Sequence, residues 1–524
     1  MDFTNERTYQ NAVDQKTVDQ FHAAYEAALS KVDPLLGLEH PLYIGKEKVM
    51  TPGRTFQDLN PANTKQVLGT FQKAGRDETA RAIEVAAKAF PDWAAQGPKD
   101  RANLLLRAAD IAAQRKFLLA ALMTVENGKN RYESMADIDE GIDMLRYYAK
   151  VYRDAEGFEQ EMGRYTPDER TKSVLRPYGV WAVVAPFNFP WAIAVGMSTG
   201  ALVTGNTVVL KPASDTPLMA LEFARIAFQA GLPPGALNVI TGPGSTIGEE
   251  IVTNPKVAGL VFTGSQEVGM ATFRRFNDPR ARPMIAEMGG KNPAIVTDHA
   301  DLEMASEGVM KGAFGFGGQK CSATSRVIVH EKVREEFLTR LVKLTKAIRV
   351  GDPTQRNVFM GPLINREAVE RFERVMPGLA KDGKVLCGGH VLTDGDHANG
   401  HFVEPTIVDG LPLGHRYLRE ELFLPILCVV TYQRFDDALR IANDIEFGLT
   451  AGIYSQDAGQ VKKFLDRIEA GVVYVNRRGG ATTGAVVGVQ PFGGWKASSV
   501  TFKHAGGPHY LLQFVREQSR TTYP

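Results

Sequence analysis

The stretch VWAVVAPFNFPWAIAVGMSTGALVTGNTVVL, residues 180–210, decides the fold. It carries no charged side chain and is long enough to suggest a membrane span. Residues that break regular structure interrupt it at Pro186, Asn188, Pro190, Gly196, Gly200, Gly205 and Asn206. Broken spans need partner segments that the rest of the chain does not offer. We therefore predict a buried strand over 180–185, a helix over 191–204 and a second buried strand over 207–210.

Strands and helices continue to alternate beyond this stretch. A helix over 218–230 and a strand over 237–241 are followed by a helix over 245–252 and a strand over 257–263. This order is typical of a parallel sheet covered by helices on both faces. The glycine turn 242–248 joins a strand to a helix and is either a phosphate cradle or a plain connection. Its glycine spacing is one residue longer than the dinucleotide-binding fingerprint.

A second alternating region follows, and we expect the change from one region to the next near Gly289 and Gly290. Its predicted helices and strands cover 294–296, 301–314, 326–330, 333–347, 425–432, 451–454 and 471–476. Amphipathic helices are predicted ahead of the first region over 77–94, 100–121 and 135–151. The first 60 residues are mixed and rich in turns. The pattern thus predicts an α/β protein with two lobes.

Composition narrows the class of protein. The chain has 524 residues, 44% of them hydrophobic and 23% charged, as in a globular protein with a large core. A net charge of +1 without a basic stripe argues against a nucleic-acid partner, and no polybasic segment favours a membrane surface. Three scattered cysteines form neither a disulfide framework nor a zinc site. We therefore expect a cytoplasmic protein without a metal.

Two side chains stand out as candidate catalytic groups. Cys321 follows a glycine-rich segment, and Lys320 beside it would favour a thiolate. From the pattern alone, Cys321 is either a nucleophile or a structural residue, Cys387 is a second candidate, and Cys428 lies in a predicted core strand. Glu287 stands beside a glycine pair and is either a general base or a surface residue.

Six short motifs, in the same order along the chain, make this sequence resemble the aldehyde dehydrogenase superfamily. They are PFNFP (186–190), KPA (211–213), FTGS (262–265), EMGGK (287–291), GQKC (318–321) and PFGG (491–494). The resemblance implies an aldehyde dehydrogenase-like α/β fold with a Rossmann-like NAD-binding lobe, an α/β catalytic lobe and a small β oligomerisation arm. The lobes would cover 1–154 with 176–289, and 290–497; the arm and C-terminal tail would cover 155–175 and 498–524.

The resemblance also implies a mechanism. Cys321 would add to an aldehyde carbon, while the side chain of Asn188 and the backbone N–H of Cys321 donate to the resulting oxyanion. Loss of a hydride to the cofactor would leave a thioester on Cys321. Glu287 would then take a proton from the water that hydrolyses this thioester to a carboxylic acid.

The implied cofactor is NAD, bound without the usual glycine fingerprint. Lys211 would reach the adenosine ribose, and Ser214 stands where the superfamily often has a glutamate, so we expect NADP to be accepted as well. Glu421 and Phe423 would hold the nicotinamide ribose. The full set of expected cofactor-binding residues is Ala185, Pro186, Phe187, Lys211, Ser214, Gly244, Gly248, Gly264, Ser265, Met288, Glu421 and Phe423.

The segment TGAVVGVQPFGG, residues 483–494, is similar to one branch of the superfamily. That branch oxidises L-glutamate γ-semialdehyde, which forms from 1-pyrroline-5-carboxylate, to L-glutamate in proline catabolism. The backbone N–H groups at Gly484 and Ala485 would bind the α-carboxylate, and Glu140 would face the α-ammonium group. The remaining expected substrate contacts are a hydroxyl from Ser322 and an aromatic sandwich of Phe187 and Phe492.

The main alternative is another small acidic semialdehyde, such as succinate semialdehyde, whose distal carboxylate Arg477 or Arg478 would bind. A binding protein without catalytic activity is a second alternative, which the presence of all three expected catalytic residues disfavours. The resemblance further implies a homo-oligomer built from dimers and coupling to proline dehydrogenase.

Overall fold

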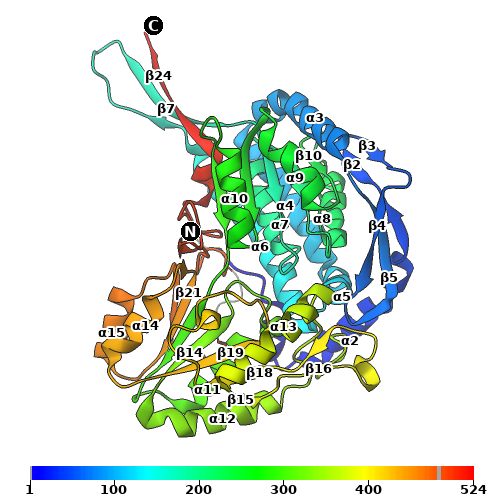
Figure 1. Cartoon of the computed structure of the whole chain (residues 1–524). Coiled ribbons are helices and arrows are strands. Elements are labelled where there is room, and N and C mark those ends of the chain that lie inside the picture. The colour runs from blue at the N-terminus through cyan, green and yellow to red at the C-terminus, as the bar shows by residue number, and fades with distance from the viewer. Residues whose placement is uncertain (1–2, 481–484, 524) are drawn as a thin grey trace.

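The computed structural model describes residues 3–480 and 485–523, which form two α/β lobes and a projecting arm (Figure 1). The first lobe is built on a seven-stranded sheet of order β12-β11-β8-β9-β10-β2-β3. These strands are β12 (Met284–Glu287), β11 (Val257–Thr263), β8 (Val180–Val184), β9 (Thr207–Lys211), β10 (Leu237–Val239), β2 (Leu42–Ile44) and β3 (Glu47–Val49). The strands from β12 to β10 run parallel, and the pair β2 and β3 continues the sheet antiparallel.

Strand β8 explains why residues 180–210 carry no charge. Val180 and Ala182 pack into the core on one face of the sheet, whereas Trp181 and Val183 pack into the core on the other face. Side chains of a strand alternate between faces, so a strand covered on both sides has to be apolar throughout. The prediction for this stretch is confirmed, with α7 (Ala192–Val203) between β8 and β9. No helix among the described residues is long and apolar enough to cross a membrane.

The order of the strands marks where a ligand can bind. The chain goes from β8 to β9 and β10 on one side, and then returns to β11 and β12 on the other side of β8. A crevice opens at such a switch point beyond the carboxyl ends of the strands, and ligands of open α/β sheets bind there. The strands β8, β9, β11 and β12 lead at these ends into Asn188, Lys211, Ser265 and Glu287, respectively.

The second lobe contains another seven-stranded sheet, of order β15-β18-β19-β14-β13-β21-β22. Its strands are β15 (Lys384–Cys387), β18 (Thr406–Asp409), β19 (Ile426–Tyr432), β14 (Thr324–His330), β13 (Asn292–Val296), β21 (Thr450–Tyr454) and β22 (Val472–Val475). Only β15 is antiparallel to its neighbour. The chain passes from the first sheet to the second between β12 and β13, where Gly289 and Gly290 lie.

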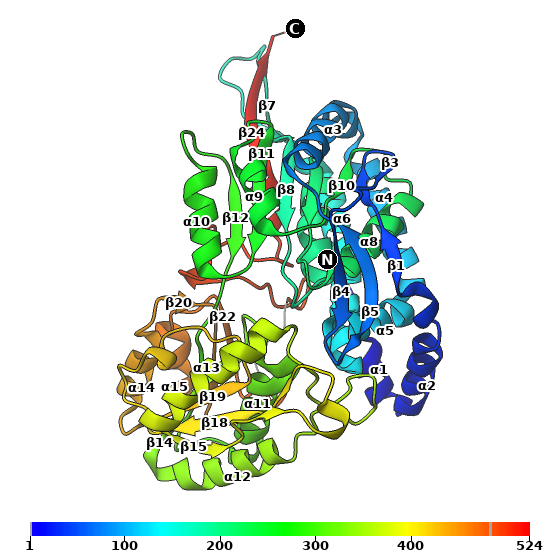
Figure 2. The same ribbon diagram turned by 45° about the vertical axis from the view of Figure 1, so that its right-hand side comes forward.

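Helices cover both sheets (Figures 1 and 2). In the first lobe they are α3 (Arg76–Ala95), α4 (Pro98–Gln114), α5 (Lys116–Asn127), α6 (Arg131–Asp154), α7, α8 (Pro217–Gln229), α9 (Gly244–Thr253) and α10 (Gln266–Phe276). In the second they are α11 (Leu302–Phe314), α12 (Arg334–Lys346), α13 (Arg366–Asp382), α14 (Phe435–Asn443) and α15 (Ala458–Arg467). The single helix predicted over 100–121 was wrong, because the chain leaves helical geometry at Arg115 (φ −104°, ψ 4°) between α4 and α5.

The amino-terminal residues are more regular than their turn-rich sequence suggested. They form α1 (Thr8–Asp14), α2 (Val18–Leu29) and a small sheet of β1 (Leu38–His40), β5 (Asn63–Gln72) and β4 (Thr55–Asn60). The arm is a separate sheet in which β7 (Arg170–Pro177) pairs with β24 (Val515–Thr522) and with the short β6 (Gln160–Glu161). It extends away from the body in both ribbon views (Figures 1 and 2).

Candidate active site

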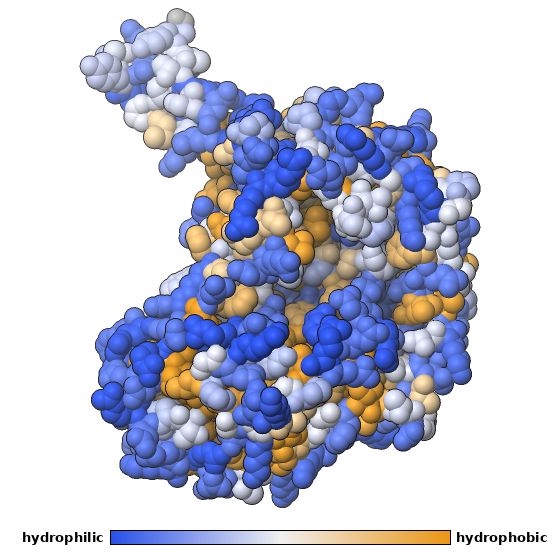
Figure 3. All heavy atoms as spheres, in the orientation of Figure 1, coloured by the Kyte–Doolittle hydropathy of each residue, from blue (hydrophilic) through white to orange (hydrophobic). Residues whose placement is uncertain are grey.

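The two lobes meet at a seam, and the face of the molecule in Figure 3 is hollowed between them. Cys321 and Glu287 both line a cavity at this seam, and most of the other side chains that line it are apolar. Its other lining residues come from α6, the loop before α7, α7, β11, β12 and the segment after 484: Glu140, Met144, Tyr148, Phe189, Ala192, Ile193, Gly196, Met197, Val261, Phe262, Thr263, Ile285, Ala485, Phe492, Ala505 and Tyr510. A thiol and a carboxyl group therefore share a largely apolar space.

Cys321 is half-buried on a tightly turned loop that precedes β14. Three consecutive residues, Phe316, Gly317 and Gly318, have positive φ angles of 48°, 60° and 68°. The side-chain amide of Asn292 donates to the carbonyl of Cys321 at 2.7 Å and holds the loop. Burial, and then the carboxyl groups of Glu421 and Glu287, raise the pKa of the Cys321 thiol. The thiol therefore has to lose a proton before it can attack a carbonyl carbon.

The prediction that Lys320 favours a thiolate on Cys321 was wrong. Its Nζ lies 2.6 Å from Oε1 of Glu133 on α6, and the two side chains are only 5% and 6% exposed. Glu133 also accepts the backbone N–H of Phe316 at 3.2 Å. The charge of Lys320 is therefore satisfied by Glu133, and the pair ties the loop of Cys321 to α6.

Glu287 ends β12 and is held by two donors. The hydroxyl of Ser499 donates to Oε1 and the backbone N–H of Gly494 donates to Oε2, each at 2.9 Å. Burial raises the pKa of Glu287 to about 8 despite these hydrogen bonds. A carboxyl group with a pKa near the working pH can both take up and release a proton, as a general base must. Ser499 lies 212 positions away and was not anticipated from the sequence.

Asn188 follows β8 and is buried, with 3% of its surface exposed. Within residues 3–480 and 485–523, no partner forms a hydrogen bond with its side chain. The backbone beside Asn188 is held in place, because the side-chain amide of Asn127 donates to the carbonyl of the preceding residue, Phe187, at 2.6 Å. An amide with free N–H groups at this edge of the sheet suits the expected role as an oxyanion donor, which stays a prediction.

One helix face of α6 forms the far end of the cavity. Glu140, Met144 and Tyr148 are spaced four residues apart, so their side chains lie on the same side of α6. This spacing was visible in the sequence and could have identified Met144 and Tyr148. Oε1 of Glu140 accepts the backbone N–H of Ala485 at 3.0 Å, and burial raises the pKa of Glu140 to about 8.

The expected aromatic sandwich needs a correction. Phe492 lines the cavity together with Phe189, whereas Phe187 packs edge-on against Phe423 at a centroid distance of 5.8 Å. Ser322 is buried behind Cys321, and its carbonyl accepts from the hydroxyl of Thr450 at 3.3 Å. Its role as a substrate donor stays a prediction. Gly484 lies outside the described residues.

The expected cofactor residues lie along the carboxyl edge of the first sheet. Lys211 is buried, its Nζ donates to the carbonyl of Pro212 at 2.8 Å, and burial lowers its pKa to about 8. Gly244 begins α9 close to Lys211, since a Cβ atom built on Gly244 would lie 4.0 Å from Cε of Lys211. The hydroxyl of Ser265 caps α10 by accepting the N–H of Val268.

The other expected cofactor residues also lie near the switch point or the seam. Ala185 and Met288 are buried, and Pro186 is half-buried. Gly264 stands against the ring of Phe262, and Gly248 is open on its outer side.

Glu421 and Phe423 come from the loop before β19 in the second lobe. Oε1 of Glu421 accepts the N–H of Gly290 at 2.8 Å, and a Cβ atom at Gly289 would lie 2.1 Å from Oε2. Because Gly289 has no side chain, the segment that connects the two lobes can lie directly against the carboxylate of Glu421. Phe423 has a φ of 57°. The part of the chain that the structure describes contains no cluster of three or more potential metal ligands.

Known proteins resemble this chain over its whole length. Residues 49–519 match the sequence model of the aldehyde dehydrogenase family. A 1-pyrroline-5-carboxylate dehydrogenase of a Geobacillus species is 40% identical over 509 residues, which cover 96% of each chain. The chain belongs to the aldehyde dehydrogenase family. The six sequence motifs of this aldehyde dehydrogenase therefore have a common origin with the corresponding motifs of its relatives.

Solved structures agree with this assignment. A Thermus 1-pyrroline-5-carboxylate dehydrogenase with bound NAD superposes with a TM-score of 0.93 at 36% identity, covering 100% of this aldehyde dehydrogenase and 99% of that chain. Proline utilization A from Bdellovibrio bacteriovorus gives a TM-score of 0.93 at 35% identity, and the match covers 100% of this chain but 53% of the larger protein.

Proposed function

We propose that this aldehyde dehydrogenase oxidises L-glutamate γ-semialdehyde to L-glutamate with NAD as the cofactor. The observation that carries the proposal is the cavity that holds Cys321 and Glu287 at one part of its wall and Glu140 with Ala485 at another. The first pair supplies a nucleophile and a base, and the second pair offers a carboxyl group and a backbone amide to an amino acid. The names of the Geobacillus and Thermus relatives support the same substrate.

The groups along the first sheet fit a dinucleotide. Lys211 supplies a buried ammonium group, Ser214 and Ser265 supply hydroxyls, and helix α10 points its N-terminus at the same edge. Glu421 supplies a carboxylate that can accept from ribose hydroxyls. When bound, NAD supplies the acceptor for the hydride that leaves the substrate carbon.

The chain's own residues carry the remaining steps. Cys321 releases its proton to solvent, and the thiolate forms a bond to the aldehyde carbon, so that the carbonyl oxygen becomes an oxyanion. Asn188 and the backbone N–H of Cys321 donate to this oxyanion. After oxidation, the substrate is held as a thioester on Cys321. Glu287 takes a proton from water, whose oxygen attacks the thioester carbon, and the acid leaves as the Cys321 thiolate is restored.

Succinate semialdehyde is less well supported. Arg478 forms ion pairs with Glu303 and Glu307 at 3.3 and 2.7 Å, on the outside of the molecule. The Nη1 of Arg477 donates to Oε1 of Gln490 at 3.1 Å. Neither arginine lines the cavity of Cys321, among the residues that the structure describes.

Steady-state production of NADH across a panel of aldehydes tests the proposal. We expect the highest kcat/KM for L-glutamate γ-semialdehyde, followed by shorter acidic semialdehydes and then uncharged aldehydes. A higher kcat/KM for succinate semialdehyde would transfer the assignment to that substrate.

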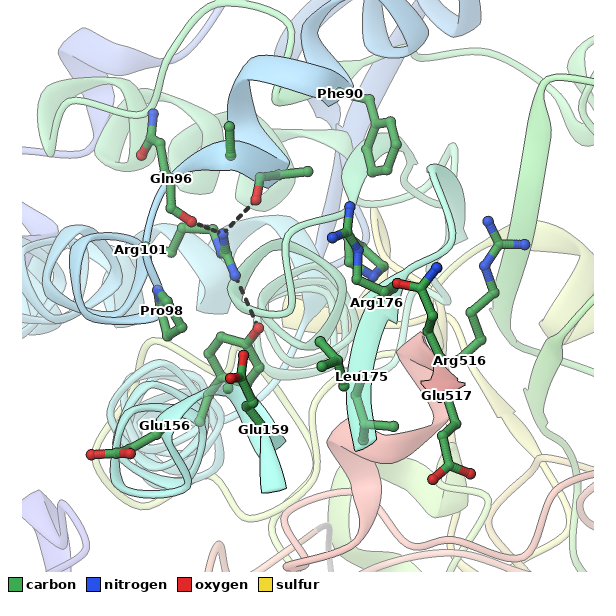
Figure 4. A pocket seen from close by; sticks show the side chains of 18 of the residues that line it. Phe90, Gln96, Pro98, Arg101, Glu156, Glu159, Leu175, Arg176, Arg516 and Glu517 are labelled. Carbon is green, nitrogen blue, oxygen red and sulfur yellow. Dashed lines mark hydrogen bonds between the residues drawn. The ribbon is translucent and has the colours of Figure 1, made fainter. Parts of the chain in front are cut away.

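The arm supports a homo-oligomer as part of the proposal. Strand β24 is an edge strand of eight residues, seven of them exposed, and such an edge readily pairs with another chain. At its base lies a groove of about 1130 Å³, around which Arg176, Arg516 and Glu517 are arranged (Figure 4). Sedimentation of the full chain and of a chain shortened after Val515 should give an oligomer and a smaller species, respectively. A monomer in both would contradict this part.

Two further parts of the proposal concern the setting of the enzyme. Three free cysteines are consistent with action in the cytoplasm. The match to about half of proline utilization A supports coupling to an enzyme that oxidises proline.

A further inference from the structure

The first described residues of the chain pack against α6, the helix that forms the far end of the cavity. The backbone N–H and the hydroxyl of Thr8 both donate to Asp139, each at 2.8 Å. The backbone N–H of Glu6 and the side-chain amide of Asn5 both donate to Asp143, each at 2.9 Å. Two buried carboxyl groups, one turn apart on α6, thus bind this amino-terminal segment.

Residues 3–8, which we call the strap, are fixed at further points along their length. The ring of Phe3 packs edge-on against Tyr147 of α6 at a centroid distance of 5.2 Å. The carboxylate of Glu6 lies 2.6 Å from a guanidinium nitrogen of Arg146. The strap lies ahead of the part of the chain that matches the family model, so it is an addition to what that model covers.

The strap also contacts the loop that carries the backbone amide of Ala485. The side-chain amide of Asn5 has two N–H groups to donate. Its nitrogen lies 2.9 Å from Oδ2 of Asp143 and 2.9 Å from the carbonyl oxygen of Val487. Asn5 is therefore a bridge between α6 and the loop formed by residues 485–490.

This loop is short and closed on itself. The backbone N–H of Val486 donates to the carbonyl of Gln490 at 3.1 Å. Gly488 has a φ of 72°, and a Cβ atom built on it would lie 3.4 Å from the ring of Phe3. The strap thus contacts the loop at its middle, through one hydrogen bond and one aromatic ring.

The strap forms part of the wall of a space that adjoins the cavity of Cys321. Residues 5–7 line this space, and Glu140, Phe189 and Ala485 line both the space and the cavity. No described residue of the strap lines the cavity itself. The strap therefore lies beside the substrate-binding end of the cavity and away from the reacting thiol.

We propose that the strap positions the loop 485–490, and that Asn5 is the positioning residue that makes this connection. The inference rests on the proposed function, in which the backbone N–H of Ala485 binds the α-carboxylate of the substrate. A loop that is ordered before binding costs the substrate no ordering entropy. The strap thus favours aldehydes that carry a carboxylate and leaves the reaction at Cys321 unchanged.

Asn5→Ala tests the proposal by removing both donors of the bridge. Hydrogen exchange of the loop amides, measured by mass spectrometry, should become about 5- to 20-fold faster, as expected for the loss of one or two hydrogen bonds. The KM for L-glutamate γ-semialdehyde should rise by a similar factor without a change in kcat. The kcat/KM for propanal, which has no carboxylate, should not change. An equal loss for both aldehydes would overturn the proposal.

Gln10→Ala is the matched control, because it also replaces a side-chain amide in the wall of the same space. Gln10 lies on α1 and donates to Asp14 at 2.8 Å on the surface. This variant should keep the wild-type exchange rates and both kinetic constants. A raised KM for the semialdehyde in Gln10→Ala would show that any change of this wall weakens binding, and it would overturn the role of Asn5.

A second variant tests whether Asn5 acts through α6. Asp143→Asn keeps an oxygen for the N–H of Glu6 but turns an amide nitrogen toward Asn5, so the bridge is broken from its other end. It should raise the KM as Asn5→Ala does, and the double variant should be no worse than the poorer single variant. Multiplying effects in the double variant would show that the two residues act independently, and the proposal would be wrong.

The two measurements separate this inference from the proposed function, because hydrogen exchange needs no substrate. If exchange becomes faster in Asn5→Ala but the KM stays at the wild-type value, the loop does not place a substrate-binding group, and the inference is wrong. If the wild-type enzyme oxidises propanal but not L-glutamate γ-semialdehyde, the proposed function fails, and the exchange rates alone decide whether the strap holds the loop.

Discussion

The cavity of Cys321 and the cofactor edge of the first sheet are constructed in different ways. In the cavity, the reactive groups are held by residues that are far away in the sequence, as Glu287 is by Ser499 and Gly494. At the cofactor edge, groups are held by their sequence neighbours, as Lys211 is by Pro212. The carboxyl group with the raised pKa is thus placed by tertiary contacts, whereas the expected cofactor contacts of the first sheet lie on strand–loop–helix segments.

The largest expected effect tests the centre of the cavity. Cys321→Ser should lower kcat by roughly 10,000-fold, because an alcohol is a much weaker nucleophile than a thiolate. Binding of NAD, measured by calorimetry, should not change, since the cofactor edge does not depend on this side chain. Cys387→Ser is the control and should keep the wild-type rate. Appreciable turnover by the Cys321 variant would show that another group attacks the aldehyde.

The second prediction separates the two chemical steps. Glu287→Gln should lower the steady-state rate by about 100- to 1000-fold, because the amide cannot accept a proton from water. Formation of the thioester should persist, so rapid mixing should show one equivalent of NADH per active site and then a stop. Continuous turnover without this burst would mean that a different base serves hydrolysis.

The pH dependence should follow the same carboxyl group. Burial raises the pKa of Glu287 to about 8, and the base acts only when it is deprotonated. Hydrolysis of the thioester should therefore slow as the pH falls through this value, by about tenfold for each pH unit below it. Single-turnover hydrolysis measured from pH 6 to 9 checks this, with Glu287→Gln as the baseline. A rate that is flat over this range would show that the pKa of the acylated enzyme differs or that another step limits.

The two regions also differ in how well the sequence predicted them. The strands β8, β9 and β11 and the loops after them follow from local apolar runs and turn residues, and those loops carry most of the residues expected to bind the cofactor. The lining of the cavity required long-range contacts: Phe189 takes the place expected for Phe187, and Lys320 is neutralised by Glu133 from α6. No local pattern reports which charged partner a side chain finds after folding.

The smallest expected effect lies at the cofactor edge. Ser214 is half-buried in the loop between β9 and α8, close in sequence to Lys211. The carboxylate nearest to it in sequence, Asp215, accepts from the side-chain amide of Asn365 at 3.1 Å, so it is engaged by the second lobe. Asp215 also acts electrostatically on Lys211, so an uncharged residue at position 214 adds no second carboxylate there and lets Lys211 pair with a 2′-phosphate. Ser214→Glu should weaken the binding of NADP by about 10- to 100-fold, or about 1.4–2.8 kcal/mol, and should change the binding of NAD little. Ser214→Gln, of similar size but uncharged, separates repulsion from crowding, and titration of both cofactors should show the loss only with glutamate. An equal loss in both variants would mean that space and not charge selects the cofactor here, and an unchanged ratio of NADP to NAD affinity would place Ser214 away from the ribose.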